Sequence, residues 1–146
     1  MILTQEDIEK RVSQARSLHR AGFNCSQAVF AACADLYHIP QDQALRLSAS
    51  FGGGIGGTRS VCGAVCAMCM VEGLRSGSAT PGDLDGKKAN YARVQQLLEQ
   101  FKRQHGGSVI CAELLQNPAN PSCNDKVANA ARIALQSVRT APLPEN

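Results

Sequence analysis

The sequence predicts an all-α protein, folded as one compact, single-domain bundle of about six or seven helices. Its 146 residues match the length of one domain. Twenty alanines, only 4% aromatic residues and no tryptophan favour closely packed helices over a β-sandwich. Apolar residues also recur at helical spacing in segment after segment, with capping residues before them and glycine or proline after them.

Three helices are expected in the first third of the chain. Thr4, with an acidic residue three positions later, has the pattern of a capping box and opens the first helix, which Gly22 ends. Asn24 is a good N-cap for the second helix, which stops before Pro40. A third, shorter helix is expected over residues 41–51.

The remaining helices follow a glycine-rich loop. Ser60 is the expected N-cap of the fourth helix, and the longest helix should run from about residue 85 to 105 and form the backbone of the bundle. Ser108 is expected to cap a short helix. After a break at residues 117–121, Ser122 or Asn124 caps the last helix.

This pattern predicts one domain over residues 1–140 and a frayed tail over residues 141–146. The net charge is only +3 and the basic residues are scattered, so no nucleic-acid partner is expected. No apolar run is long enough to span a membrane, and the polar N-terminus lacks the apolar region of a signal peptide. These features predict a cytoplasmic protein without membrane insertion.

Seven cysteines in a reducing compartment point to metal, cluster or redox chemistry rather than to a disulfide framework. Four of them lie close behind the expected N-caps, in the first turn of a helix. Free N–H groups and the positive end of the helix dipole there favour a thiolate, the form that attacks, reduces or binds metal. These four candidates are Cys25, Cys62, Cys111 and Cys123.

The other three cysteines, Cys33, Cys66 and Cys69, are interpreted as small core residues. The C-x₃-C-x₂-C spacing that begins at Cys62 is also that of the cluster site in radical-SAM enzymes. There it belongs to a loop of a larger barrel, whereas here it falls on one face of a helix. The C-x-x-C within it lies in the middle of the same helix, which disfavours a thioredoxin-like motif.

The loop at residues 52–57 has five glycines among its six residues and allows two interpretations. It is either a flexible loop with close helix contacts, or a nest of N–H groups from Gly53, Gly54 and Gly56 that faces thiolates or a cluster. Arg59 would add a positive charge nearby, although a solvated side chain is the commoner outcome.

Three histidines, His19, His38 and His105, fall at the ends of predicted helices. We expect each to interact with carbonyl groups there rather than to bind metal.

Several stretches together resemble the C_GCAxxG_C_C family of small bacterial and archaeal redox-active proteins. They are Gly22–Val29, Phe51–Gly56, Val61–Ala64 and Cys111–Leu115 followed by Cys123. The resemblance assigns the family's four cysteines to Cys25, Cys62, Cys111 and Cys123, which the helix-start argument selects independently. Ala67 departs from the pattern, because it stands where the family motif has its final glycine.

The leading functional hypothesis is an electron carrier in which the four cysteines bind an iron–sulfur cluster, most simply [2Fe–2S], or zinc. A thiol–disulfide protein without a cofactor is the first alternative, with Cys111/Cys123 or Cys25/Cys62 as the reactive pair. A non-redox helical interaction module is the second. The redox partner and any enzymatic reaction are left open, as is a homo-oligomer.

Overall fold

A computed structural model describes residues 2–145, and residues 1 and 146 lie outside it. Within the described residues, regular structure consists of seven α-helices and two 3₁₀ turns, which confirms the predicted all-α class. The turns are η1 (Asp35–Tyr37) and η2 (Ala49–Phe51). The α-helices are α1 (Gln5–Arg20), α2 (Cys25–Ala34), α3 (Gln41–Ser48), α4 (Gly63–Ser76), α5 (Leu84–Gln104), α6 (Cys111–Gln116) and α7 (Cys123–Val138).

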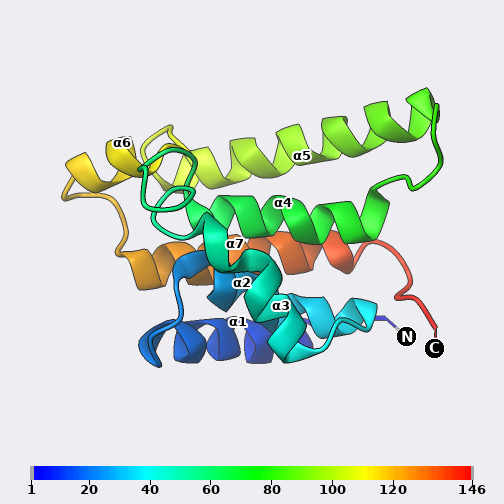
Figure 1. Ribbon diagram of the computed structural model, residues 1–146, viewed down its shortest axis with the longest axis horizontal. Helices are drawn as coiled ribbons and strands as arrows, with labels where there is room; N and C mark the ends of the chain where they lie inside the picture. The colour runs from blue at the N-terminus through cyan, green and yellow to red at the C-terminus, as the bar shows by residue number, and fades with distance from the viewer. Residues whose placement is uncertain (1, 146) are drawn as a thin grey trace.

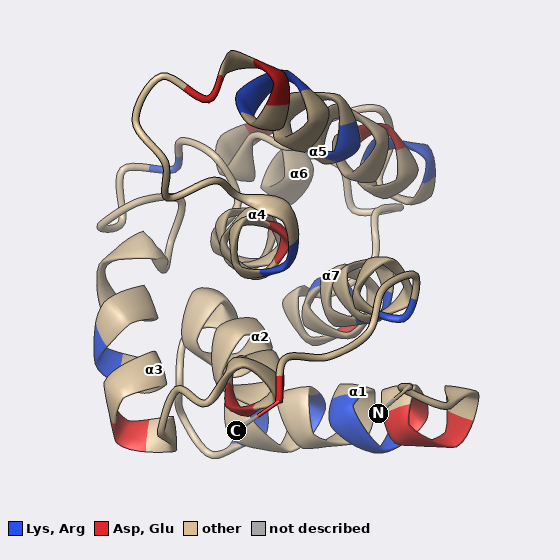
Figure 2. Ribbon diagram, turned by 90° about the vertical axis from the view of Figure 1, so that its right-hand side faces the viewer, with Lys and Arg blue, Asp and Glu red and all other residues tan. Residues whose placement is uncertain are grey.

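Helices α2, α4 and α7 pack against one another at the centre of the bundle. Helix α1 covers α2 and α7, α3 lies against α2, and α5 packs on α4 and α7 (Figure 1). The end-on view in Figure 2 shows α4 with α5 on one side and α2 and α7 on the other. No helix of the described residues is long and apolar enough to cross a membrane.

The longest helix, α5, lies at an edge of the bundle, so the prediction that it forms the backbone was wrong. Its buried side chains are only Leu97 and Phe101, and Tyr91 on the expected apolar face is 57% exposed. The central helices instead bury small residues, which let helix backbones approach closely. Their buried alanines are Ala28, Ala31, Ala32, Ala34, Ala64, Ala67, Ala128, Ala130, Ala131 and Ala134.

The predicted caps at Asn24 and Ser122 are confirmed, whereas those at Ser60 and Ser108 were wrong. The N-caps observed at these two helix starts are Cys62 for α4 and Ile110 for α6. An antiparallel β-bridge between Val61 and Ile110 holds both segments extended and delays both helices.

The third predicted helix is divided. Helix α3 ends at Ser48, whose hydroxyl donates a hydrogen bond to the Ala44 carbonyl oxygen over 2.7 Å, and the chain tightens into η2. Such bonding of a serine to the carbonyl four residues back weakens regular helix geometry.

The described part of the C-terminal tail, residues 141–145, contacts the body of the protein. Leu143 is buried against the core, and the Pro144 carbonyl oxygen lies 3.2 Å from Nε2 of His38. Residue 146 of the tail that was expected to fray lies outside the described residues.

Candidate functional site

All four candidate cysteines face one cavity of about 210 Å³ at one end of the bundle. Cys25, Cys111 and Cys123 are the first residues of α2, α6 and α7, and Cys62 is the N-cap of α4. The structure therefore places four cysteines, from four helix starts, around one cavity. The other lining residues are His19, Asn24, Gly53, Arg59, Gly63, Leu114, Leu115 and Lys126.

Long-range backbone hydrogen bonds position two of these cysteines. On either side of the β-bridge, the Cys62 N–H donates to the Val109 carbonyl oxygen over 2.8 Å, and the Cys111 N–H donates to the Ser60 carbonyl oxygen over 2.6 Å. The starts of α4 and α6 are thus joined directly, although the two cysteines are far apart in the sequence.

Helix α1 is attached to the start of α7 in a similar way. The guanidinium of Arg16 donates to the side-chain oxygens of Asn124 and Asp125, each over 2.8 Å. The Asn124 amide also donates to Nδ1 of His19 over 3.1 Å, which directs that ring to the cavity rather than to a helix carbonyl.

Cys25 and Cys62 both line the cavity, and each changes the pKa of the other. The Cys62 thiol donates to Cys25 and, despite burial, lowers the Cys25 pKa to about 6, with help from the N–H groups of Gly53, Ser26 and Ala64. The same contact, together with burial, raises the pKa of Cys62. The lowered pKa of Cys25 favours its thiolate at neutral pH, and the raised pKa of Cys62 favours its protonated thiol.

The glycine loop winds through five consecutive residues of positive φ, residues 53–57, and closes tightly on the site. A methyl group on Gly54 would lie 2.7 Å from Cβ of Cys111, and one on Gly63 would lie 2.7 Å from Sγ of Cys25. Glycine is therefore needed at both positions for the backbone to approach the cysteines. Ile55 adopts the same left-handed conformation, which is rare for a β-branched residue.

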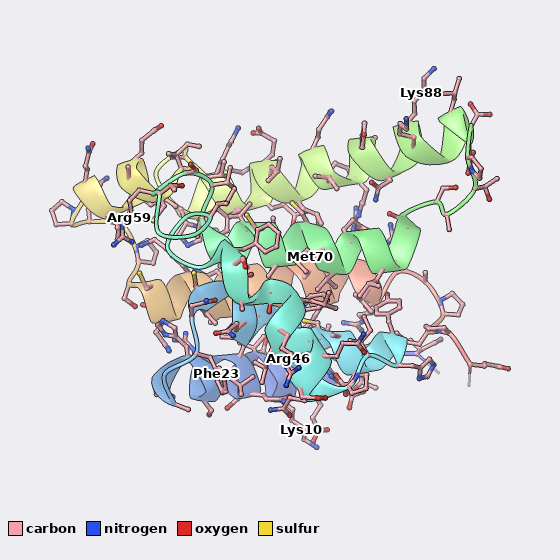
Figure 3. All side chains as sticks on the ribbon, viewed as in Figure 1. Lys10, Phe23, Arg46, Arg59, Met70 and Lys88 are labelled. Atoms are coloured by element: carbon pink, nitrogen blue, oxygen red, sulfur yellow. The ribbon has the colours of Figure 1, made fainter. Side chains whose placement is uncertain are left out.

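The three candidate glycines occupy different places. Gly53 lines the cavity and directs its N–H to Cys25. Gly54 is buried against Cys111, whereas Gly56 is exposed and does not line the cavity. Arg59, just beyond the loop, directs Nη1 to Sγ of Cys111 over 3.7 Å; Figure 3 shows its side chain at the cysteine-bearing end of the molecule.

Two of the cavity residues were not predicted: His19 was expected to contact a helix carbonyl group, and Lys126 was not singled out. The His19 ring is held at the cavity by its hydrogen bond with Asn124, and no local sequence pattern reveals this contact between two helices. Lys126, only 5% exposed, lies one turn after Cys123. Its spacing of four residues from the buried Ala130 is the one signal that places it beside the apolar face of α7.

The remaining cysteines lie outside the cavity. Cys33 is fully buried, and burial raises its pKa to about 12, whereas Cys66 and Cys69 are partly exposed on α4. All seven cysteines fall within residues 2–145 and are free thiols. In this part of the chain no three His, Cys, Asp or Glu side chains lie close enough together to hold a metal ion.

A comparison with known families gives one match. The model of a family described as "Putative redox-active protein (C_GCAxxG_C_C)" matches residues 23–137, most of the chain and all four cavity cysteines. The curated proteins and the solved structures yield no match to this chain.

Proposed function

Because the chain belongs to the C_GCAxxG_C_C family of redox-active proteins, we propose that it is a thiol–disulfide redox protein, with Cys25 as the attacking sulfur and Cys62 as its partner. The observation that carries this proposal is the position of these two cysteines at the starts of α2 and α4 on the wall of one cavity, where the pKa of Cys25 is lowered to about 6. A thiolate held next to a protonated thiol is the arrangement that disulfide exchange requires.

The proposed reaction transfers two electrons in two steps. The Cys25 thiolate attacks one sulfur of a substrate disulfide, the substrate S–S bond breaks, and one substrate thiolate leaves. Cys25 is then neutral in a mixed disulfide and no longer holds the Cys62 proton, which passes to the departing thiolate. The Cys62 thiolate attacks Sγ of Cys25, releasing the second substrate thiolate and forming a Cys25–Cys62 disulfide.

This proposal predicts both a pH profile and a product. The rate of alkylation of Cys25 by iodoacetamide should rise with pH around a midpoint of about 6, because only the thiolate reacts. In a glutathione redox buffer the protein should lose two titratable thiols, and mass spectrometry of peptides should find Cys25 joined to Cys62.

Matched variants make the test specific. Cys25→Ser and Cys62→Ser should each abolish the disulfide, whereas Cys66→Ala and Cys69→Ala should retain it, because both lie outside the cavity. A disulfide confined to Cys111 and Cys123, or no oxidation in the glutathione buffer, would refute this assignment.

An iron–sulfur cluster is the second candidate, favoured by the presence of all four cysteines around one cavity. Four thiolates are the ligand set of a [2Fe–2S] cluster, and N–H groups at helix starts stabilise thiolate ligands. Cys25, Cys62, Cys111 and Cys123 would hold the cluster, which would supply one-electron transfer, but their side chains would have to move closer together to do so. Four thiolates also suit zinc.

Anaerobic purification followed by iron, zinc and acid-labile sulfide analysis separates these candidates. A cluster predicts brown colour, equal iron and sulfide, and loss of both in each of the four Cys→Ser variants. A colourless, metal-free protein that forms the Cys25–Cys62 disulfide supports the thiol reaction instead.

A further inference from the structure

Within residues 2–145, a lysine with a largely buried side chain on the cavity wall has no counter-ion. Lys126 is only 5% exposed and lines the cavity, one turn after Cys123 on α7. Within residues 2–145 its ammonium group takes part in none of the ion pairs and none of the side-chain hydrogen bonds. A cation that lines an enclosed cavity without a carboxylate partner attracts an anion into that cavity.

A second cation flanks the same cavity. Arg59 directs its guanidinium to the Cys111 sulfur and, in the described part of the chain, pairs with no carboxylate. Neither aspartate nor glutamate is among the described residues that line the cavity. The first turns of α2 and α7, helices of 10 and 16 residues, add the positive ends of two helix dipoles.

The size of the cavity limits what the anion can be. A volume of about 210 Å³ corresponds to roughly seven water molecules at about 30 Å³ each, which suits a small molecule. Leu114 and Leu115 add an apolar wall suitable for methylene groups or sulfur, while the cations face the same space.

On the premise of the thiol–disulfide function, we propose that the substrate is a small anionic disulfide whose carboxylate or sulfonate group binds Lys126 and Arg59. Its sulfurs would then lie against the Cys25–Cys62 pair, and the two-step exchange described above would release two small anionic thiols. The cavity thus selects its substrate by charge, and the cysteines carry out the exchange.

Three small disulfides with the same S–S chemistry and different charges test this selection. Dithiodiglycolate is a dianion, bis(2-hydroxyethyl) disulfide is neutral, and cystamine is a dication. For each compound, we measure the rate at which it forms the Cys25–Cys62 disulfide in the protein. This rate is divided by the rate at which the same compound reacts with free 2-mercaptoethanol. We expect the dianion to react at least tenfold faster than the neutral compound on this scale, with the dication slowest.

Charge variants locate the selection. Lys126→Met should reduce the advantage of the dianion to about twofold, Lys126→Arg should preserve most of it, and Arg59→Gln should lower it partially. Lys88→Met is the matched control, because Lys88 is exposed near the start of α5, at the other end of the molecule from Arg59 in Figure 3. It should leave the order of the three rates unchanged.

The outcomes separate this proposal from the redox function on which it rests. Equal normalised rates for the three disulfides would overturn charge selection and leave the redox function intact. If no disulfide oxidises the Cys25–Cys62 pair, the redox function fails, and glutarate then tests the anion site as an unreactive dianion. The anion site is supported if glutarate protects Cys25 from iodoacetamide in the parent protein but not in Lys126→Met. Absence of protection in the parent protein would overturn it.

Discussion

The two ends of the bundle bury ionisable groups in opposite ways. Glu72, near the end of α4, is 1% exposed and is surrounded by partners. Its carboxylate accepts from Arg75 over 2.7 Å and from the hydroxyl groups of Ser76 and Ser137, and it lies 3.5 Å from Arg93. At the cavity end, Lys126 is buried to a similar degree without any carboxylate partner in the described residues.

This difference distinguishes a structural charge from one that is available to a ligand. The Glu72 cluster joins α4, α5 and α7 through a satisfied network, which is the condition under which a buried charge is tolerated. The cavity end leaves a cation, reactive thiols and helix N-termini directed toward open space. Each prediction below changes one side of this contrast.

The largest effect is expected at the satisfied end. Glu72→Gln removes the charge that Arg75 and Arg93 share and should lower the free energy of unfolding by about 3–5 kcal/mol. Urea denaturation measures it. Glu99→Gln removes only an exposed ion pair with Lys102 and should change stability by less than about 0.5 kcal/mol. Similar losses in both variants would contradict a structural role for the Glu72 cluster.

A somewhat smaller effect is expected in the glycine loop. Gly54→Ala introduces a methyl group 2.7 Å from Cβ of Cys111 and equally close to the backbone of Arg59 and Ser60, on a backbone of positive φ, and should cost about 2–4 kcal/mol. Gly57→Ala has positive φ but no neighbouring atom within 4 Å, so it should cost only about 1 kcal/mol. Thermal unfolding of the two variants separates close contact with the site from backbone strain; equal losses would show that the contact does not matter.

A gain in stability is expected when the unpaired cation is removed. Lys126→Met keeps the length of the side chain, removes a charge from a largely buried residue and should raise the free energy of unfolding by about 1 kcal/mol. Such a gain, coupled with the loss of anion preference, would identify Lys126 as a residue maintained for binding. Urea denaturation that shows a loss of stability would mean that the protein itself satisfies this charge.

The smallest effect concerns an unsatisfied buried hydroxyl next to Cys25. The hydroxyl of Ser26, next to Cys25, is fully buried and has no hydrogen-bond partner within residues 2–145. Ser26→Ala removes this hydroxyl and improves helix propensity, so it should stabilise the protein by up to about 1 kcal/mol. The midpoint of urea unfolding measures this gain, and a decrease would show that the hydroxyl has a partner in solution.

Local patterns in the sequence predicted the helices well, because caps and stops act within a few residues. Asn24 and Ser122 carry side chains that satisfy N–H groups of their own helices, so their role is visible from composition and spacing. Ser60 and Ser108 have the same chemistry, but pairing between Val61 and Ile110 holds those segments extended. That pairing joins distant parts of the chain and leaves no local signal.

The candidate site was predictable in its cysteines and not in its charges. Cys25 and Cys123 follow effective caps, and reasoning about helix starts also reached Cys62 and Cys111 despite the misplaced caps. Lys126 is a candidate anion-binding residue because its side chain is largely buried and has no carboxylate partner in the described residues. Both properties depend on packing between helices, which the sequence does not show. The edge position of α5 was missed for the same reason, since periodicity shows that a face is apolar but not how much of it is covered.

The placement of the four cavity cysteines at helix starts has a consequence for the order of events during synthesis. In an unfolded chain, Cys25 has neither the Cys62 proton donor nor the N–H groups of Gly53 and Ala64, so it is an ordinary thiol of low reactivity at neutral pH. Cys123 is the last of the four to emerge from the ribosome, and the cavity closes only after it. Reactivity at Cys25 therefore arises only when the glycine loop and the start of α4 have packed against the start of α2.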